Sequence, residues 1–393
     1  MINSKMYDLG KSPSKIRELF EYGKNRKRKI GEDKVFDFSI GNPSVASPDV
    51  VNETLIKLIT NTEPTLLHGY TSAAGDLTVR QKIAEYLNNT YGTNHRAEYI
   101  YLTVGAAASL TISLNALINP GDEVIVFAPY FPEYKVFVEK AGGIIKEVSP
   151  NPETFEPDLI DLENKISAKT KAVIINSPNN PTGVVISEET IIKISELLNK
   201  KSREYNGIIY LLSDEPYREL VYDGVTPFIT KYYDNTIISY SFSKSLSLPG
   251  ERIGYLLVSE KCIYKDEVFS AICGAGRALG FVCAPALFQY MIPSCLGVTS
   301  DINVYRGNRD KLYKHLTKLG YEVLKPSGAF YMFVKALEDD ATKFMEKAKK
   351  HELLLVPSDS FGYPGYVRIS YCVSPKMIDA SLTAFEKLYK EYK

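Results

Sequence analysis

The sequence predicts an α/β protein with a large domain built on a mostly parallel sheet and a smaller α+β domain. In the middle of the chain, short apolar runs alternate with segments of helical spacing, which is typical of parallel sheets. The C-terminal part groups helices and short strands without that alternation. A length of 393 residues is enough for two domains.

The expected strands of the large domain are short apolar runs with the length of buried strands. They cover residues 99–104, 123–127, 144–148, 172–176, 208–213, 236–240 and 252–258. Helix-like segments fall between several of them, at residues 107–118, 133–140 and 188–200. We therefore expect helices to connect consecutive strands of this sheet.

The C-terminal region opens with apolar side chains at helical spacing over residues 301–319, and Gly320 is well placed to end that helix. Ser374-Pro375 is an N-cap and first-turn signal for a final helix. Between them we expect strands at 321–324, 330–334, 353–356 and 366–370, and a helix at 341–350. We assign residues 48–290 to the large domain, and residues 1–47 with 291–393 to the small one.

Composition excludes several functional classes. Lys plus Arg (47) equals Asp plus Glu (47), so charge gives no argument for nucleic acid or an anionic membrane. The basic run 24–29 is expected on a solvated helix end, and no stretch of about 20 apolar residues could span a bilayer. The 5 cysteines form no CxxC pair and the 4 histidines no HExxH motif, which favours reduced thiols in a cytoplasm and no built-in metal site.

The strongest local signal is Ser241-Phe-Ser-Lys244, followed by Pro249-Gly-Glu-Arg252-Ile-Gly254, directly after an expected strand. Serine hydroxyls and a guanidinium suit a phosphate group. An amine between them could form a Schiff base with an aldehyde held by that phosphate. Together these residues outweigh the interpretation of Lys244 as a solvated surface charge.

Two further polar motifs follow expected strands. Asn176-Ser-Pro-Asn-Asn180-Pro-Thr-Gly183 could by itself be a Pro/Gly turn, and Asp214 in Asp214-Glu-Pro-Tyr217 could by itself be a helix N-cap. Together with the lysine motif, they place polar groups at the carboxyl ends of successive strands. That edge is where open α/β sheets bind ligands.

With these motifs the chain resembles fold type I enzymes that depend on pyridoxal 5′-phosphate (PLP), specifically the class I/II aminotransferases of the aspartate aminotransferase family. The resemblance runs from Gly41-Asn-Pro43 to Arg368-Ile-Ser370. It is carried by the Ser-x-Ser-Lys…Gly-x-Arg-x-Gly and Asn-Asn-Pro-Thr-Gly motifs, in that family's spacing. It implies the PLP-transferase fold.

The resemblance also implies roles. Lys244 forms the internal aldimine and then moves the proton between the substrate Cα and the cofactor. Asp214 binds the pyridinium nitrogen, which makes the ring an electron sink. Asn180 and Tyr217 donate to the 3-oxygen of the cofactor. The phosphate is bound by Ser241, Ser243 and Arg252, and by the backbone at Gly105, Ala106 and Ala107, where a helix begins.

Other positions carry the family's remaining roles. Phe131 matches the aromatic residue that stacks on the pyridine ring, with Tyr130 as the rival. Tyr70 matches a tyrosine lent to the neighbouring subunit, which implies a homodimer with shared active sites. Arg368 pairs with the substrate α-carboxylate, and Gly41 and Asn180 belong to the same substrate site. Ala106 and Ala107 depart from many relatives because they offer no hydroxyl.

The implied function is transfer of the amino group of an L-amino acid to a 2-oxo acid, for example aspartate and 2-oxoglutarate. A carbon–sulfur β-lyase on the same scaffold is the alternative. A cofactor-binding domain of a transcription regulator is disfavoured, because the match begins near residue 35 and leaves no room for a DNA-binding module. An aspartate-type enzyme needs a second cation for the side-chain carboxylate, and Arg277 and Arg218 are candidates.

Overall fold

The protein is described by a computed structural model that covers residues 2–11 and 14–393. Its central feature is a seven-stranded sheet of order β2-β8-β7-β6-β5-β3-β4. All neighbours from β4 to β7 pair in parallel, and β8 runs antiparallel to both β7 and β2. The strands are β2 (Ile100–Thr103), β3 (Glu123–Phe127), β4 (Ile144–Val148), β5 (Thr170–Asn176), β6 (Tyr210–Asp214), β7 (Thr236–Ser241) and β8 (Gly254–Val258). The predicted mostly parallel sheet is confirmed.

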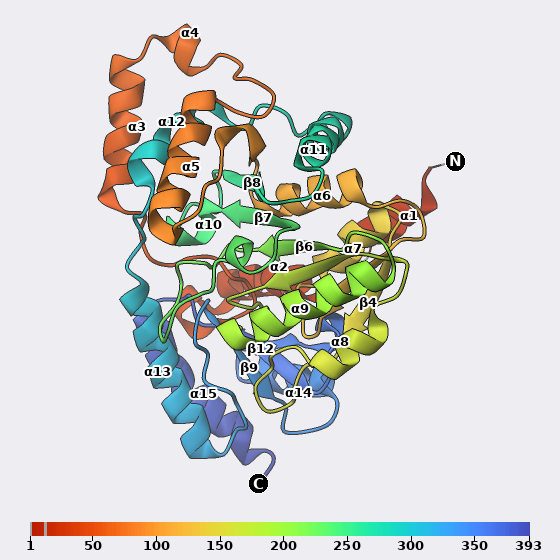
Figure 1. Ribbon diagram of the computed structural model, residues 1–393. Coiled ribbons are helices and arrows are strands. Elements are labelled where there is room, and N and C mark those ends of the chain that lie inside the picture. Colours follow the sequence, from red (N-terminus) through yellow and green to blue (C-terminus); the bar gives the residue numbers. More distant parts are fainter. Residues whose placement is uncertain (1, 12–13) are drawn as a thin grey trace.

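Helices cover both faces of this sheet, as Figure 1 shows with α6 (Ala106–Leu117) and α11 (Lys265–Leu279) on one side and α9 (Glu188–Glu204) on the other. Side chains alternate accordingly along β3. Val124 and Val126 pack in the core under α6 and α11, whereas Ile125 and Phe127 pack under α9. Burial on both faces explains why these strands read as continuous apolar runs.

The remaining helices of the middle of the chain flank this sheet. On the α9 side, α5 (Leu77–Tyr91) and α12 (Ala286–Cys295) share a core with β2 and β8. The others are α3 (Asp49–Asn61), α4 (Pro64–Leu67), α7 (Glu133–Lys140), α8 (Leu159–Lys165) and the short α10 (Phe242–Ser245).

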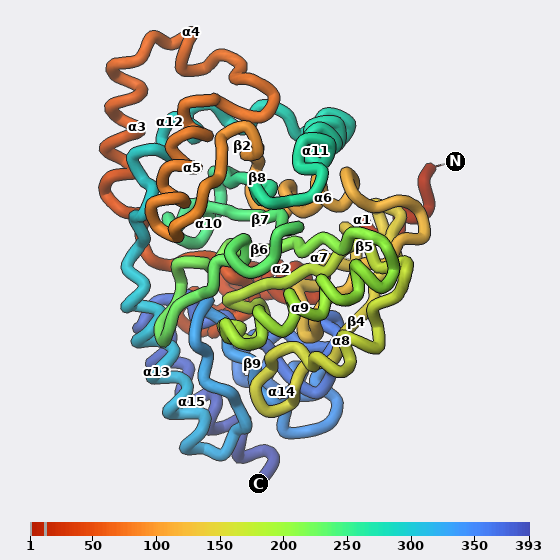
Figure 2. Tube along the Cα trace, in the orientation of Figure 1, coloured from red at the N-terminus to blue at the C-terminus, as the bar shows by residue number. Residues whose placement is uncertain are grey.

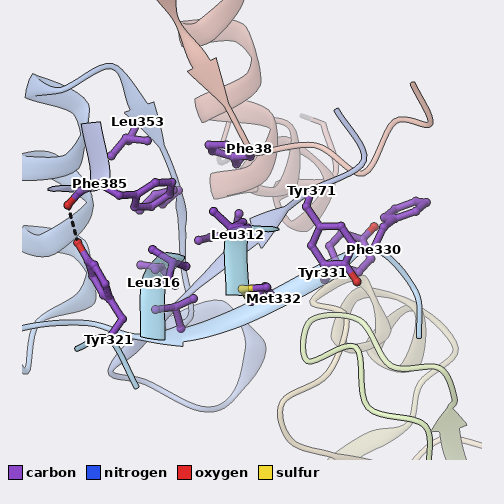
Figure 3. Close-up of a cluster of buried hydrophobic side chains, with 14 of the residues drawn as sticks. Phe38, Leu312, Leu316, Tyr321, Phe330, Tyr331, Met332, Leu353, Tyr371 and Phe385 are labelled. Atoms are coloured by element: carbon purple, nitrogen blue, oxygen red, sulfur yellow. Dashed lines mark hydrogen bonds between the residues drawn. The ribbon is translucent and has the colours of Figure 1, made fainter. Parts of the chain in front are cut away.

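An N-terminal segment lies against the C-terminal part of the chain in a second body of structure, as the tube in Figure 2 shows. β1 (Phe36–Asp37) pairs with β10 (Leu353–Leu354), and Phe38 enters the core of the C-terminal part (Figure 3). That core is framed by a three-stranded antiparallel sheet, β11-β12-β9. The further elements are α1 (Ser4–Lys11), α2 (Lys15–Ile30), α13 (Ile302–Leu319), β9 (Tyr331–Lys335), α14 (Ala341–Lys350), β11 (Val356–Pro357), β12 (Tyr366–Ser370) and α15 (Pro375–Lys390).

The division into two domains, with boundaries at residues 47/48 and 290/291, stays a prediction; the second boundary falls within α12. Two local predictions were wrong. Residues 321–324 form no strand and contribute one isolated bridge from Val323 to Val334, because Pro326 soon follows and lacks an N–H donor. The strand predicted from Arg252 begins at Gly254, because Arg252 has φ 51°, outside the extended region.

Three findings concern the excluded classes. Within residues 2–11 and 14–393 no helix is long and apolar enough to cross a membrane. The cysteines are all free. The described part of the chain holds no group of three or more metal-ligating side chains.

Candidate active site

The predicted polar motifs meet at one edge of the seven-stranded sheet. β5 ends at Asn176, β6 at Asp214 and β7 at Ser241. Asn176 is the register partner of Asp214, and its side-chain amide donates to the Asp214 carbonyl at 2.8 Å. The side-chain Oδ1 of Asn176 accepts from the Asn180 backbone N–H at 2.8 Å, so the turn is tied to the strand end.

Lys244 lies on α10, immediately after β7. Its ammonium donates to the Gly41 carbonyl at 2.6 Å and lies 5.5 Å from the centre of the Phe330 ring. Burial of the amine lowers the pKa of Lys244 to about 8, helped by the positive charges of Arg252 and Arg368. An amine with this pKa reaches its neutral, nucleophilic form near neutral pH.

Asp214 is a buried carboxylate with one unused oxygen. Tyr134 donates to its Oδ2 at 2.5 Å, and Oδ1 has no hydrogen-bond partner in the described structure. Burial raises the pKa of Asp214 to about 7, against the hydrogen bond from Tyr134 that lowers it. A buried unpaired carboxylate oxygen is costly, and the N–H of a pyridinium ring would satisfy it.

A cradle for an anion lies beside Lys244. The hydroxyls of Ser241 and Ser243 are 2.8 Å apart, and Arg252 donates to the Ser243 hydroxyl at 3.2 Å and to the Val104 carbonyl at 3.0 Å. α6 begins at Ala106, directly after Gly105, so its free backbone N–H groups add a positive helix end. Hydroxyls, a guanidinium and a helix N-terminus fit a phosphate group.

Arg368 lies on β12, at the other side of the site. It is buried with 2% exposure, and it donates to Asn180 Oδ1 at 3.1 Å and to the Ser39 carbonyl. No carboxylate pairs with it among the described residues, and its Nε has no partner. A buried guanidinium without a counter-ion is expensive, so the site fits an incoming carboxylate.

Tyr331 connects these two sides. Its hydroxyl is 2.9 Å from that of Tyr217, and its ring lies 4.7 Å from the Arg368 guanidinium. A Cβ at Gly41 would come within 2.0 Å of the Tyr331 hydroxyl, so the close approach of this backbone requires glycine. Close contacts therefore join Lys244, Gly41, Tyr331, Tyr217 and Arg368 in one cluster.

The two candidates for the stacking aromatic residue are placed differently. The Tyr130 hydroxyl donates to Glu147 at 2.7 Å, and its backbone N–H donates to the Phe361 carbonyl. These two bonds hold Tyr130 against Glu147 and Phe361. Phe131 is partly exposed and meets the Tyr134 ring edge-on at 5.8 Å. The geometry favours Phe131.

Of the two candidates for a second cation, Arg218 is excluded by its place. It is buried, paired with Glu215 at 2.5 Å, and surrounded by aromatic rings including that of Tyr240. Arg277 lies exposed on α11.

Two other predicted site residues lie at the surface of the chain. Tyr70 is 98% exposed, and Ala107 is also exposed at the start of α6.

Sequence reasoning missed Tyr134, Tyr331 and Ser39. Tyr134 follows Phe131 by three residues, at the start of α7, so its nearness in sequence could have placed it near the ring site. Tyr331 lies within the expected strand 330–334, where it resembles an ordinary core aromatic residue. Ser39 acts through its backbone carbonyl, so neither residue gave a motif.

Comparisons with known proteins agree with this geometry. A family model described as aminotransferase class I and II matches residues 33–385. An aspartate aminotransferase of Thermotoga maritima is 33% identical over 365 residues, covering 91% of this chain and 92% of that protein. The crystal structure of an amino transferase from Eubacterium rectale superimposes with a TM-score of 0.98 at 58% identity, over 100% of this chain and 99% of that chain. Aspartate aminotransferase from Thermus thermophilus, with maleate, gives 0.88 at 26% identity over 99% of each chain.

Proposed function

The chain belongs to the class I and II aminotransferases, and from this premise we propose how its residues bind cofactor and substrates and move the proton. It transfers the amino group of an L-amino acid to a 2-oxo acid. When bound, pyridoxal 5′-phosphate supplies an electron-withdrawing ring that stabilises negative charge on the substrate Cα. Three features of the site fit this group. Asp214 Oδ1 has no hydrogen-bond partner in the described structure, Gly105 lets Arg252 approach the anion cradle closely, and burial favours the neutral amine of Lys244.

The residues at the sheet edge would hold that group. The phosphate would be held by the hydroxyls of Ser241 and Ser243, by Arg252 and by the backbone at residues 105–107. Asp214 would hold the pyridine nitrogen protonated, and Asn180 and Tyr217 would donate to the 3-oxygen. Phe131 would cover the ring, and Tyr134 would keep Asp214 oriented.

Lys244 is the proposed catalytic base. Its amine is held at 2.6 Å from the Gly41 carbonyl in the free enzyme, and burial favours the neutral form that can accept a proton. The flanking guanidiniums of Arg252 and Arg368 oppose protonation, which makes the amine a proton carrier rather than a permanent cation. In this role it would take the proton from the substrate Cα and deliver it to C4′ of the cofactor.

The single observation that carries the substrate proposal is Arg368. Amino acids and 2-oxo acids share an α-carboxylate, and a buried guanidinium without a carboxylate partner in the described chain suits it. We propose aspartate and 2-oxoglutarate as the first pair to test, because the Thermotoga maritima relative is named an aspartate aminotransferase. Nothing in the site favours the β-lyase alternative, and we do not carry it forward.

The proposal includes a homodimer in the cytoplasm. Tyr70 projects into solvent with 98% exposure, and the exposed apolar side chains of Ile56, Ile59 and Leu66 lie on the same stretch of chain. A second subunit would cover this surface and receive Tyr70. The free thiols are those expected in a reducing compartment.

A panel of amino donors with 2-oxoglutarate tests the function. Arg368→Ala should lower kcat/KM for all donors alike, by the ~2–5 kcal/mol typical of a lost buried charge pair. Arg368→Lys should recover only part, because an ammonium cannot form the bidentate pair. Arg203→Ala, on the exposed face of α9, is the control for losing an arginine. A loss of activity confined to acidic donors would contradict the assignment, because it would mean that Arg368 binds the substrate side chain. Release of pyruvate from cysteine conjugates would instead support the β-lyase alternative.

A further inference from the structure

The loop between β4 and α8 packs one aromatic side chain, that of Phe155, against the three-stranded sheet. The Phe155 ring centre lies 5.6 Å from each of the rings of Phe333, Tyr363 and Tyr366. The interplanar angles are 86°, 83° and 89°, so all three contacts are edge-to-face. Edge-to-face geometry is the favoured arrangement for aromatic pairs.

The loop holds Phe155 in a backbone conformation that bulky residues rarely adopt. Its φ is 56°, in the left-handed region. The loop is closed by hydrogen bonds from the Phe155 N–H to the Asn151 carbonyl at 2.8 Å and from the Asn151 N–H to the Glu156 carbonyl at 2.7 Å. The Glu156 carboxylate accepts from the Ser187 N–H at 2.7 Å, which fastens the loop to the start of α9. The strained residue is thus anchored to the start of α9, and its ring packs against the three-stranded sheet.

The aromatic rings that receive Phe155 share a sheet face with the substrate-binding arginine. Tyr366 and Arg368 are two residues apart on β12, so both side chains point to the same side. Phe333 is the register partner of Arg368 on β9, and Tyr331 lies two residues before Phe333. The Phe333 and Tyr366 rings stack at 4.8 Å with an angle of 4°. On this face, Phe333 and Tyr366 contact Phe155, and the neighbouring Tyr331 and Arg368 belong to the candidate active site.

We propose that Phe155 is a positioning residue, which docks the three-stranded sheet against the β4–α8 loop and thereby keeps Arg368 facing the substrate carboxylate. The inference rests on the proposed role of Arg368. If the docking contact is lost, a smaller fraction of molecules has Arg368 in place. The apparent affinity for every ligand with an α-carboxylate is then reduced in proportion to the fraction of molecules that have Arg368 in place.

Other contacts keep the two sheets joined when Phe155 is changed. Arg309 on α13 pairs with Asp223 at 2.6 Å, and the Tyr222 N–H donates to the Ser327 carbonyl at 2.8 Å. Among the described residues, no hydrogen bond joins this loop to the cofactor residues on β6, β7 and α6. Substitution of Phe155 should therefore act on substrate affinity and leave cofactor binding unchanged.

The experiment compares Phe155→Ala, Phe155→Leu and Phe155→Tyr in the holoenzyme. KM should rise about tenfold in Phe155→Ala, equal to ~1.4 kcal/mol, by the same factor for several amino acids and for 2-oxoglutarate. Turnover and the cofactor absorbance should stay close to those of the parent. Phe155→Leu should be intermediate, and Phe155→Tyr should restore most of the affinity. Tyr264→Ala is the matched control, because Tyr264 is also a left-handed aromatic residue but is 64% exposed.

A double variant shows whether Phe155 acts through Arg368. Adding Phe155→Ala to Arg368→Ala should raise KM little further, because the group being positioned is already gone. Multiplicative effects, an unchanged KM, or a fall in kcat at constant KM would each overturn the proposal. If Arg368→Ala alone leaves KM unchanged, the proposed role of Arg368 in substrate binding is wrong. This result differs from the three that would overturn the role of Phe155, so the two failures can be distinguished. Should Phe155→Ala not fold, Phe155→Leu carries the same test.

Discussion

Lys244 is surrounded by groups that act on its charge in opposite directions. Burial and the guanidiniums of Arg252 and Arg368 favour the neutral amine, whereas a thiolate at Cys372 would favour the ammonium. The result is a pKa of about 8, well below the usual 10.4 of lysine. Its chemistry should therefore depend on pH close to neutrality.

The first prediction concerns cofactor capture by cofactor-free protein. Because only the neutral amine attacks an aldehyde, the rate of reaction with pyridoxal 5′-phosphate should rise with pH and level off above about 8. Stopped-flow absorbance measures this rate. Borohydride reduction and peptide mapping should then place the pyridoxyl group on Lys244. A flat profile between pH 6 and 9, or a label on another lysine, would contradict the assignment; Lys169→Ala, on an exposed turn, is the control.

Asp214 shows the opposite shift, with its pKa raised to about 7 in the cofactor-free site. An unfolded aspartate has a pKa near 3.9, so between about pH 4 and 7 the folded chain binds a proton that the unfolded chain releases. The free energy of unfolding contributed by this group therefore falls as pH rises through that range.

The second prediction follows from this sign. Asp214→Asn should remove that decline, so the cofactor-free variant should lose less stability between pH 4 and 7 than the parent. The same variant should keep much of its cofactor and lose most of its transaminase activity, because the ring nitrogen is no longer held protonated. Urea unfolding at several pH values checks the first effect and steady-state assays the second. Near-normal turnover would show that Asp214 does not serve the ring nitrogen.

At the scale of elements, the start of α6 depends on a glycine. Gly105 has φ 93°, and a Cβ there would lie 2.6 Å from an Arg252 guanidinium nitrogen. The glycine thus lets the helix end and the arginine approach the same anion. Gly121 has a similar φ of 91° but nothing within 4 Å of a Cβ.

The third prediction compares these two glycines. Gly105→Ala should weaken cofactor binding at least about tenfold, ~1.4 kcal/mol, because Arg252 must move. Gly121→Ala carries the same backbone strain of ~1–3 kcal/mol and should lower stability without changing cofactor affinity. Equilibrium titration with pyridoxal 5′-phosphate, alongside thermal unfolding, separates the effects. Equal losses of affinity would mean that backbone strain alone, not the cradle, is responsible.

Elements of the large sheet could be predicted because their signals are local. Strands buried on both faces give continuous apolar runs, and residues next to a strand end, such as Lys244 and Asp214, stand out as motifs. The pairing of β1 with β10 could not be read in the same way, because each strand has two residues and they lie far apart in the chain. Tyr331 and Phe155 were missed for a related reason: their roles arise only where two distant segments meet.

At the scale of the whole molecule, one surface is out of keeping with an isolated chain. α3 and the segment after it expose Ile56, Ile59 and Leu66, and Tyr70 is 98% exposed. Tyr70 has no aromatic or hydrogen-bonding partner in the described structure. A tyrosine held out in this way, next to exposed apolar side chains, is expected to bury itself against another subunit.

The fourth prediction tests whether Tyr70 completes the neighbouring site. If it does, a heterodimer of a Lys244→Ala chain with a Tyr70→Phe chain collects both defects in one site and leaves the other site intact. A heterodimer of Lys244→Ala with Arg252→Ala instead leaves each site with one defect, because both residues serve their own chain. The first mixture should therefore keep about half of the parental activity per dimer, as one of its two sites is whole. The second mixture should be nearly inactive.

Differently tagged chains, purified as heterodimers, allow the activities of the two mixtures to be compared. Equal activity of the two mixtures would place Tyr70 in its own chain's site, and a monomer in solution would refute the shared site altogether.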